Sequence, residues 1–175
     1  MKILYAPCGG QNGSATVYAL LKHMYHAKFG GEPIPEIQKT PNGKPYFPDR
    51  PDVYFSLSHS RTHVLCALSD KPVGVDIESP RTISERAVIY FCSNEELALF
   101  DPLDLWVLKE SYVKLFGETM AMIKSLRFSR DGDRIVAPDK SVISKLYRSG
   151  DYRAAVCSIY EAPPDSIEPA PIDFQ

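Results

Sequence analysis

The sequence predicts a fold of mixed helices and strands, built as one domain or as two small lobes that share a core. Its 175 residues suit either arrangement. Hydrophobic residues make up 44% of the chain, which is enough apolar surface to offset the entropy lost on folding. Both halves place a helical part before several strands. This shared order suggests an internal duplication, although single residues do not repeat.

Capping residues mark where the expected helices begin. Ser14 precedes the first helix, and Ser93 with Glu96 forms a capping box before the second. Asp101 and Pro102 supply an N-cap and a proline at the first helical position of the third helix. The expected elements, in chain order, are a strand at 2–7, a helix at 16–29, strands at 52–58, 63–69 and 73–78, helices at 95–100 and 103–116, and a hairpin at 141–162.

The strands at 63–69 and 73–78 are expected to pair with each other as a hairpin. The residues between them, Asp70-Lys71-Pro72, are typical of a turn. After the second strand, Ser79-Pro80-Arg81 interrupts the alternation of apolar and polar residues, so we place a boundary between lobes there. The two expected lobes are an N-terminal one, 1–80, and a C-terminal one, 81–175.

Two carboxylates share one face of the strand at 73–78. Strand neighbours two apart point the same way, so Asp76 and Glu78 lie together, with Gly74 beside them and the apolar residues opposite. Adjacent anions repel unless a cation lies between them. Paired carboxylate oxygens suit Mg²⁺, and Gly74 is expected to leave room for the ion. The ordinary alternative is an edge strand with two solvated charges.

The helix at 103–116 carries a further acid and two lysines. Glu110 and Lys114 are four residues apart and therefore share one face, with Lys109 at its edge. The ordinary alternative is a surface ion pair worth a few tenths of a kcal/mol. Trp106 is expected to lie in the core.

Composition and the chain start exclude some classes of function. The formal net charge of −2 provides no basic field for nucleic acid or an anionic membrane. No apolar run approaches the length of a membrane span, and the first ten residues lack the apolar core of a signal peptide. The four cysteines have no metal-binding spacing and are expected to be reduced. We therefore expect a cytoplasmic protein.

Four short motifs occur in order along the middle of the chain, and together they resemble the 4′-phosphopantetheinyl transferase superfamily, of the surfactin-synthetase-activating type. The resemblance spans roughly residues 40–120. The matching segments are Gly43 to Phe47 (GKPYF), Phe55 to Ser60 (FSLSHS), Val73 to Glu78 (VGVDIE) and Trp106 to Lys114 (WVLKESYVK).

The resemblance implies an α+β fold of two similar α/β lobes related by a pseudo-twofold, with the active site in the cleft between them. It implies that the 4′-phosphopantetheine arm of coenzyme A is transferred to a serine of an apo acyl- or peptidyl-carrier protein, giving the holo carrier and 3′,5′-ADP. A monomer is expected, because two lobes in one chain already supply the cleft.

The resemblance also implies a role for each matched residue. Mg²⁺, or Mn²⁺ in its place, would be held on the pyrophosphate by Asp76, Glu78 and Glu110. The residues expected to contact the phosphates of coenzyme A, beside Asp76, are Lys44, Ser58, His59, Lys109 and Lys114. A carrier serine is a poor nucleophile and needs a base, for which Glu110, directly or through a metal-bound water, is the candidate. Lys114 and Lys109 would add positive charge at the leaving phosphate.

Two parts of the chain match the family only in outline. No motif selects the basic residues that hold the adenine and 3′-phosphate; Lys22, Lys28 and Lys39 are the candidates. For carrier docking the candidates are Tyr90, Phe91, Leu97, Arg81 and Arg86. Two other functions stay open: a metal-dependent phosphohydrolase of coenzyme A or nucleotides, and a non-catalytic module that binds coenzyme A or a carrier.

Overall fold

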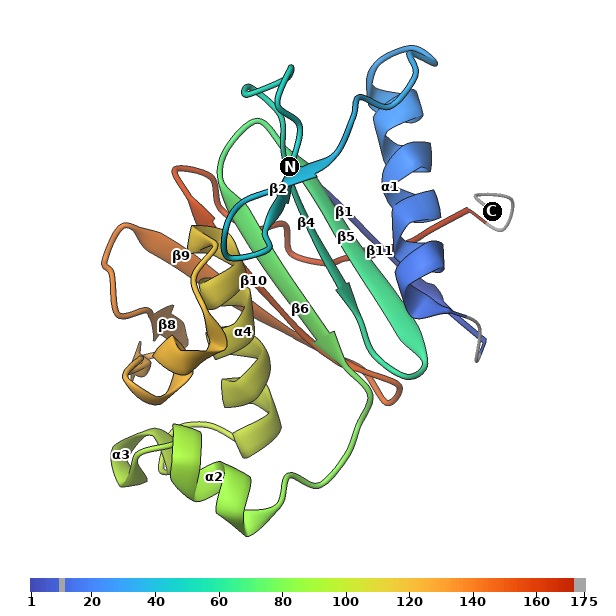
Figure 1. The fold of residues 1–175 in the computed structure, drawn as a ribbon. Helices are drawn as coiled ribbons and strands as arrows, with labels where there is room; N and C mark the ends of the chain where they lie inside the picture. Colours follow the sequence, from blue (N-terminus) through green and yellow to red (C-terminus); the bar gives the residue numbers. More distant parts are fainter. Residues whose placement is uncertain (10–11, 172–175) are drawn as a thin grey trace.

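The computed structural model describes residues 1–9 and 12–171, whose strands form two large sheets and one small sheet of two short strands, with helices against the large ones (Figure 1). The elements of the first part are β1 Lys2–Pro7, α1 Gly13–Lys28, β2 Gln38–Lys39, β3 Pro45–Tyr46, β4 Tyr54–His59, β5 His63–Ser69 and β6 Val73–Glu78. Those of the second part are α2 Glu85–Phe91, α3 Asn94–Leu97, α4 Pro102–Phe116, the 3₁₀ helix η1 Met120–Lys124, β7 Ser129–Asp131, β8 Arg134–Val136, β9 Val142–Arg148, β10 Arg153–Ile159 and β11 Glu168–Pro169.

The two larger sheets are stacked, and each has one long helix on its outer face. The strand order is β11-β1-β5-β4 in the first sheet and β6-β10-β9-β8-β7 in the second. Helix α1 packs on the first sheet and α4 on the second, as Figure 1 shows. A shared core between the sheets is formed by Ile3, Leu65, Ala67, Val73, Val75, Ile77, Ala154 and Val156.

The hairpin predicted for 63–69 and 73–78 is wrong, although both strands have the predicted limits. Strand β5 pairs with β1 and β4, whereas β6 pairs with β10 of the other sheet. The apolar face of β6 needs a partner surface, and stacking against the first sheet buries it more completely than edge pairing would. The short link at 70–72 therefore carries the chain from one sheet to the other.

Serine hydroxyls of β4 satisfy the free edge of β6. Ser56 Oγ accepts the Val75 N–H at 3.0 Å, and Ser58 Oγ accepts the Ile77 N–H at 3.3 Å. Buried backbone donors need such partners. The serines of the FSLSHS motif thus join the two sheets where no strand pairing does.

Several caps are confirmed. Asp101 caps α4, whose last turn ends at Gly117 with a left-handed φ of 68°, and the Ser93–Glu96 capping box is present. The cap of α1 is Asn12 rather than Ser14, since the Asn12 side chain accepts the N–H groups of the first turn. Helix α2 was not predicted; it is short and has few buried residues.

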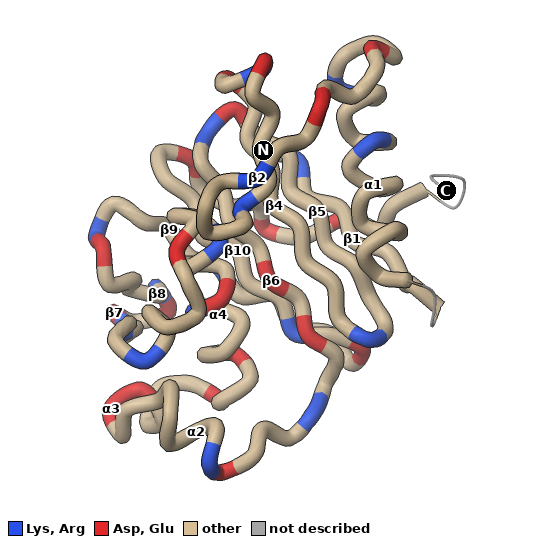
Figure 2. Tube along the Cα trace, in the orientation of Figure 1, with Lys and Arg blue, Asp and Glu red and all other residues tan. Residues whose placement is uncertain are grey.

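Charge is distributed over the whole fold. Figure 2 shows basic and acidic residues interspersed along the described chain rather than separated onto different elements. None of the described helices is long and apolar enough to cross a membrane.

Candidate active site

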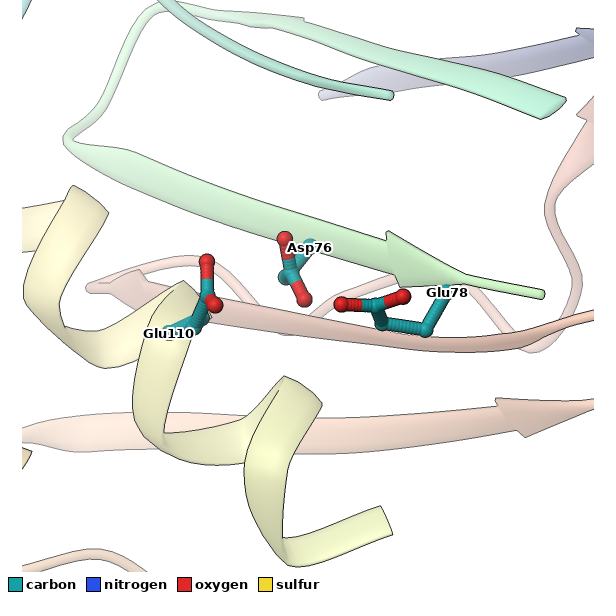
Figure 3. A group of neighbouring side chains, drawn as sticks. All are labelled: Asp76, Glu78 and Glu110. Atoms are coloured by element: carbon teal, nitrogen blue, oxygen red, sulfur yellow. The ribbon is translucent and has the colours of Figure 1, made fainter. Parts of the chain in front are cut away.

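Three carboxylates meet where the outer face of β6 contacts α4. Asp76 and Glu78 come from β6 and Glu110 comes from α4, and their side chains point toward one another (Figure 3). One oxygen of each can be chosen so that all three lie within 4.8 Å of one another. The structure therefore brings together the three acids that the sequence places on two separate elements.

The absence of a side chain at Gly74 allows β6 and α4 to come close together. A Cβ atom at Gly74 would lie 2.1 Å from the Ser111 carbonyl oxygen and 2.3 Å from the Leu115 backbone nitrogen. Only glycine lets the α4 backbone come this close to β6. The expectation that Gly74 leaves room for an ion is wrong; it leaves room for the helix that carries Glu110.

The two carboxylate oxygens of Asp76 differ in their hydrogen bonding: one accepts two hydrogen bonds, and the other accepts none among the described residues. It is 3% exposed, and its Oδ1 accepts hydrogen bonds from Ser58 Oγ at 2.7 Å and Lys114 Nζ at 2.5 Å. Its Oδ2 is buried and has no hydrogen-bond partner among the described residues. A buried carboxylate oxygen without a partner is costly. A bound cation would supply the missing partner.

Glu78 is oriented by two donors. Its Oε1 accepts the indole N–H of Trp106 at 3.1 Å and a guanidinium N–H of Arg81 at 3.2 Å. Trp106 is therefore not simply a core residue. Its position four residues before Glu110 places both on one helical face, and this spacing was the signal that could have identified it.

Glu110 holds a proton more strongly than an ordinary glutamate. Burial, together with the negative charges of Asp76 and Glu78, raises its pKa to about 7, and the Lys114 ammonium 3.6 Å away opposes the shift. Burial works against the charge of Lys114, but Asp76 and Glu110 outweigh it and raise the lysine's pKa. The cluster thus carries more negative charge than one ammonium neutralises.

The residues present fit a hard divalent cation. All three donors are carboxylates, one oxygen has no partner, and the acids raise one another's affinity for positive charge. Mg²⁺ favours oxygen ligands and binds with only a few protein carboxylates. Asp76, Glu78 and Glu110 are therefore the candidate ligands of one ion.

A cleft of about 470 Å³ adjoins the cluster through Lys114. It lies between α1, the short β2–β3 hairpin, β4 and the end of α4. The charged and polar residues among its lining are Ser14, Lys39, Asn42, Lys44, Ser56, His59, Lys114, Glu118 and Thr119. Of the three lysines considered for the 3′-phosphate, Lys39 lines this cleft, whereas Lys28 pairs with Asp70.

Lys44 and His59 line the cleft, but Ser58 does not. Lys44 Nζ donates to the Leu115 carbonyl at 2.5 Å, and burial lowers its pKa to about 8. His59 lies against Gly13, close to the start of α1. Ser58 is only 5% exposed and is turned toward Asp76 and Lys114, so it orients the acid.

Lys109 points away from the cluster, and the structure contradicts its expected contact with phosphate. Its side chain is fully buried, and its ammonium donates to the carbonyls of Phe91 and Leu126 and to Glu96. All three ammonium protons are used within the protein. One residue along a helix turns by about 100°, which is enough to send Lys109 toward α2 and α3 while Glu110 faces β6.

The comparisons with known proteins agree with this geometry. A model of the 4′-phosphopantetheinyl transferase superfamily matches residues 72–159, half of the chain. These residues include β6, α4 and all three acids. The match therefore covers the part of the chain that builds the cluster.

Curated relatives carry the same name. The chain is 33% identical over 142 residues to the 4′-phosphopantetheinyl transferase Sfp of Bacillus subtilis, covering 71% of this chain and 63% of that protein. It is 30% identical over 168 residues to the 4′-phosphopantetheinyl transferase psf-1 of Bacillus pumilus, covering 85% of this chain and 72% of that protein. The chain thus spans less than two thirds of the length of Sfp. With the family model and these relatives in agreement, the chain belongs to the 4′-phosphopantetheinyl transferase superfamily.

Proposed function

We propose that the chain transfers the 4′-phosphopantetheine arm of coenzyme A to a serine of an apo acyl- or peptidyl-carrier protein, with release of 3′,5′-ADP. The observation that carries this proposal is the cluster of Asp76, Glu78 and Glu110, joined through Lys114 to a cleft lined by cationic side chains. The relatives named above are 4′-phosphopantetheinyl transferases, which agrees with such a site.

The cation site serves the pyrophosphate of coenzyme A. Asp76, Glu78 and Glu110 would hold Mg²⁺, or Mn²⁺ in its place. When bound, the ion neutralises pyrophosphate charge that would otherwise be repelled by three acids. Lys114 already neutralises part of the cluster, and it is placed to stabilise the phosphate oxygens that gain charge as the bond breaks.

The transfer exchanges one phosphorus–oxygen bond for another. The carrier serine Oγ forms a bond to the phosphorus that bears the pantetheine arm, and the bond from that phosphorus to the bridging oxygen breaks. The electron pair leaves with 3′,5′-ADP, and the serine proton passes to Glu110. A positioned carboxylate can take up such a proton in the transition state.

The cleft would bind the rest of coenzyme A. Lys44 and His59 are positioned along it from the N-terminal half of the chain and Lys114 from α4. Lys39 is the cleft residue best suited to the 3′-phosphate. Cationic side chains in a partly enclosed cleft attract phosphate more strongly than they would at an open surface.

The carrier would dock near α2 and α3. Tyr90 is 59% exposed and Leu97 39% exposed, and Arg81 and Arg86 are exposed basic residues nearby that suit an acidic carrier surface. Phe91 is 1% exposed and belongs to the core, so its expected docking role is withdrawn. Suitable carriers are those of fatty acid, polyketide or nonribosomal peptide synthesis.

We infer two lobes, 1–80 and 81–175, related by a pseudo-twofold with the active site between them; each part contributes one long helix and most strands of one large sheet, which supports this. Strand pairing crosses the boundary between the lobes, because β6 pairs with β10 and β11 pairs with β1.

We also infer that the chain is a monomer, binds no nucleic acid and works in the cytoplasm. A cytoplasmic protein suits the four free cysteines.

One experiment tests the proposed function. The chain is incubated with coenzyme A, Mg²⁺ and a panel of apo carriers, and the products are weighed by mass spectrometry. A carrier heavier by one phosphopantetheine arm supports the transfer. Free phosphopantetheine with no modified carrier would instead indicate a phosphohydrolase, and binding without either product would indicate a non-catalytic module.

A further inference from the structure

Trp106 is the one tryptophan of the chain, and it contacts Glu78 of the carboxylate cluster. Its indole N–H donates to Glu78 Oε1 at 3.1 Å. The indole N–H can only donate a hydrogen bond, so the Glu78 oxygen is the acceptor in this contact. A neutral donor on Oε1 leaves the negative charge of Glu78 available to a cation.

The indole ring is fixed independently of Glu78. It packs against the Phe91 ring with centroids 5.1 Å apart and the planes at 67°. Phe91 is itself 1% exposed, and its carbonyl accepts a hydrogen bond from the buried Lys109. A rigid aromatic contact of this kind holds the N–H in place before any ligand arrives.

The second donor to Glu78 has a different character. Arg81 lies on the link between β6 and α2, and its side chain is about half exposed. It contacts both Glu78 oxygens, at 3.2 and 3.4 Å. Exposed ion pairs of this type contribute little and rearrange readily. Trp106, rather than Arg81, is therefore the fixed support of Glu78.

We infer that Trp106 is a positioning residue for the cation site: its N–H holds Glu78 in the orientation that presents the carboxylate to the ion. The inference rests on the proposed function, because it assigns a partner to one of the proposed ligands. Residues that orient metal ligands typically affect metal affinity by 10- to 100-fold. The single tryptophan also makes this contact visible in the intrinsic fluorescence of the protein.

The test measures cation binding without coenzyme A or a carrier. The full chain and its Trp106→Phe variant are titrated with Mn²⁺ by calorimetry, and the wild-type chain is titrated with Mg²⁺ by tryptophan fluorescence. The variant keeps an aromatic ring against Phe91 and loses the N–H donor, together with part of the bulk of the indole. Ile89→Ala is the matched control, since Ile89 lies on α2 with Phe91 and is 73% exposed.

We expect Trp106→Phe to bind Mn²⁺ about ten-fold or more weakly, with the control unchanged. We also expect a saturable change in wild-type fluorescence at the Mg²⁺ concentrations that fill the site. Equal Mn²⁺ affinity in Trp106→Phe and wild type would overturn the inference, as would Mg²⁺ binding with no change in fluorescence. If the Phe variant does not fold, the wild-type fluorescence decides alone. Absence of any cation binding by the wild type would overturn both this inference and the proposed cation site, whereas a failed carrier assay would overturn only the proposed function.

Discussion

The Lys114 ammonium lies 2.5 Å from Asp76 Oδ1 and 3.6 Å from a Glu110 oxygen, so one cation of the protein bridges two of the three clustered acids. This contact comes from two elements, β6 and α4, that approach each other across Gly74. It leaves Asp76 Oδ2 and the third acid, Glu78, outside the reach of that ammonium. The remaining negative charge is what a divalent cation would neutralise.

Replacement of Asp76 by asparagine should lower the transfer rate at saturating Mg²⁺ by about 100-fold or more, because the cluster loses a charged ligand. The fold should remain, as judged by circular dichroism. Asp133→Asn is the matched control, because Asp133 is an exposed acid between β7 and β8, and its rate should equal that of the wild type. Near-full activity of Asp76→Asn with Mg²⁺ would remove Asp76 from the metal site.

Gly74→Ala should unfold the protein or destabilise it by at least about 3 kcal/mol, because the added Cβ meets the α4 backbone and overpacking displaces the helix. Gly150→Ala is the control: a Cβ there meets no atom within 4 Å, and the glycine has no left-handed φ. Urea unfolding of both variants measures the difference. A Gly74→Ala protein as stable as Gly150→Ala would contradict the close approach of β6 and α4.

Lys109→Met should cost about 3–5 kcal/mol of stability, because it leaves the Glu96 carboxylate buried without its counter-charge. Adding Glu96→Gln should recover part of the loss, since the amide carries no charge. Lys145→Met is the control, because its partner Asp165 is fully exposed and such exposed pairs contribute little to stability. A stable Lys109→Met protein with weakened coenzyme A binding would restore the phosphate role for Lys109.

Lys44 should make stability depend on pH in the alkaline range. Its pKa is about 8 in the folded protein and about 10.4 in an unfolded chain, so the unfolded chain binds more protons between these values. The free energy of unfolding of the wild type should therefore rise with pH across this window, relative to Lys44→Met, by roughly 1–3 kcal/mol. Urea unfolding of both proteins at pH 7.5 and 9.5 measures it. A difference that stays constant or falls would show that Lys44 is not buried in this way.

The limits of the middle strands followed from the sequence, but their partners did not. The alternation at 73–78 gives β6 its ends and its two faces, because both depend only on neighbouring residues. Which strand pairs with β6 depends on how two sheets stack, and that is decided by distant segments such as β10. The expected hairpin failed for this reason.

For the candidate site too, local patterns predict some residues, whereas the roles of others depend on distant segments. Asp76, Glu78 and Glu110 were found because fixed strand and helix periods place each on a definite face, and the family motifs connected the two elements. Lys109 was misassigned because its buried acceptors come from the end of α2 and from Leu126, which no local pattern connects to α4. Trp106 and Arg81 act through Glu78: the spacing of Trp106 and Glu110 indicates a shared helical face, but the hydrogen bonds to Glu78 appear only in three dimensions.

The most direct test of the account follows the mass of an apo carrier during incubation with coenzyme A, Mg²⁺ and either the wild-type chain or Glu110→Gln. We predict that the wild-type chain adds one phosphopantetheine arm to the carrier serine, that chelation of the metal stops the addition, and that Glu110→Gln slows it by at least about 100-fold while remaining folded. Transfer by Glu110→Gln at the wild-type rate would contradict the role assigned to the three acids.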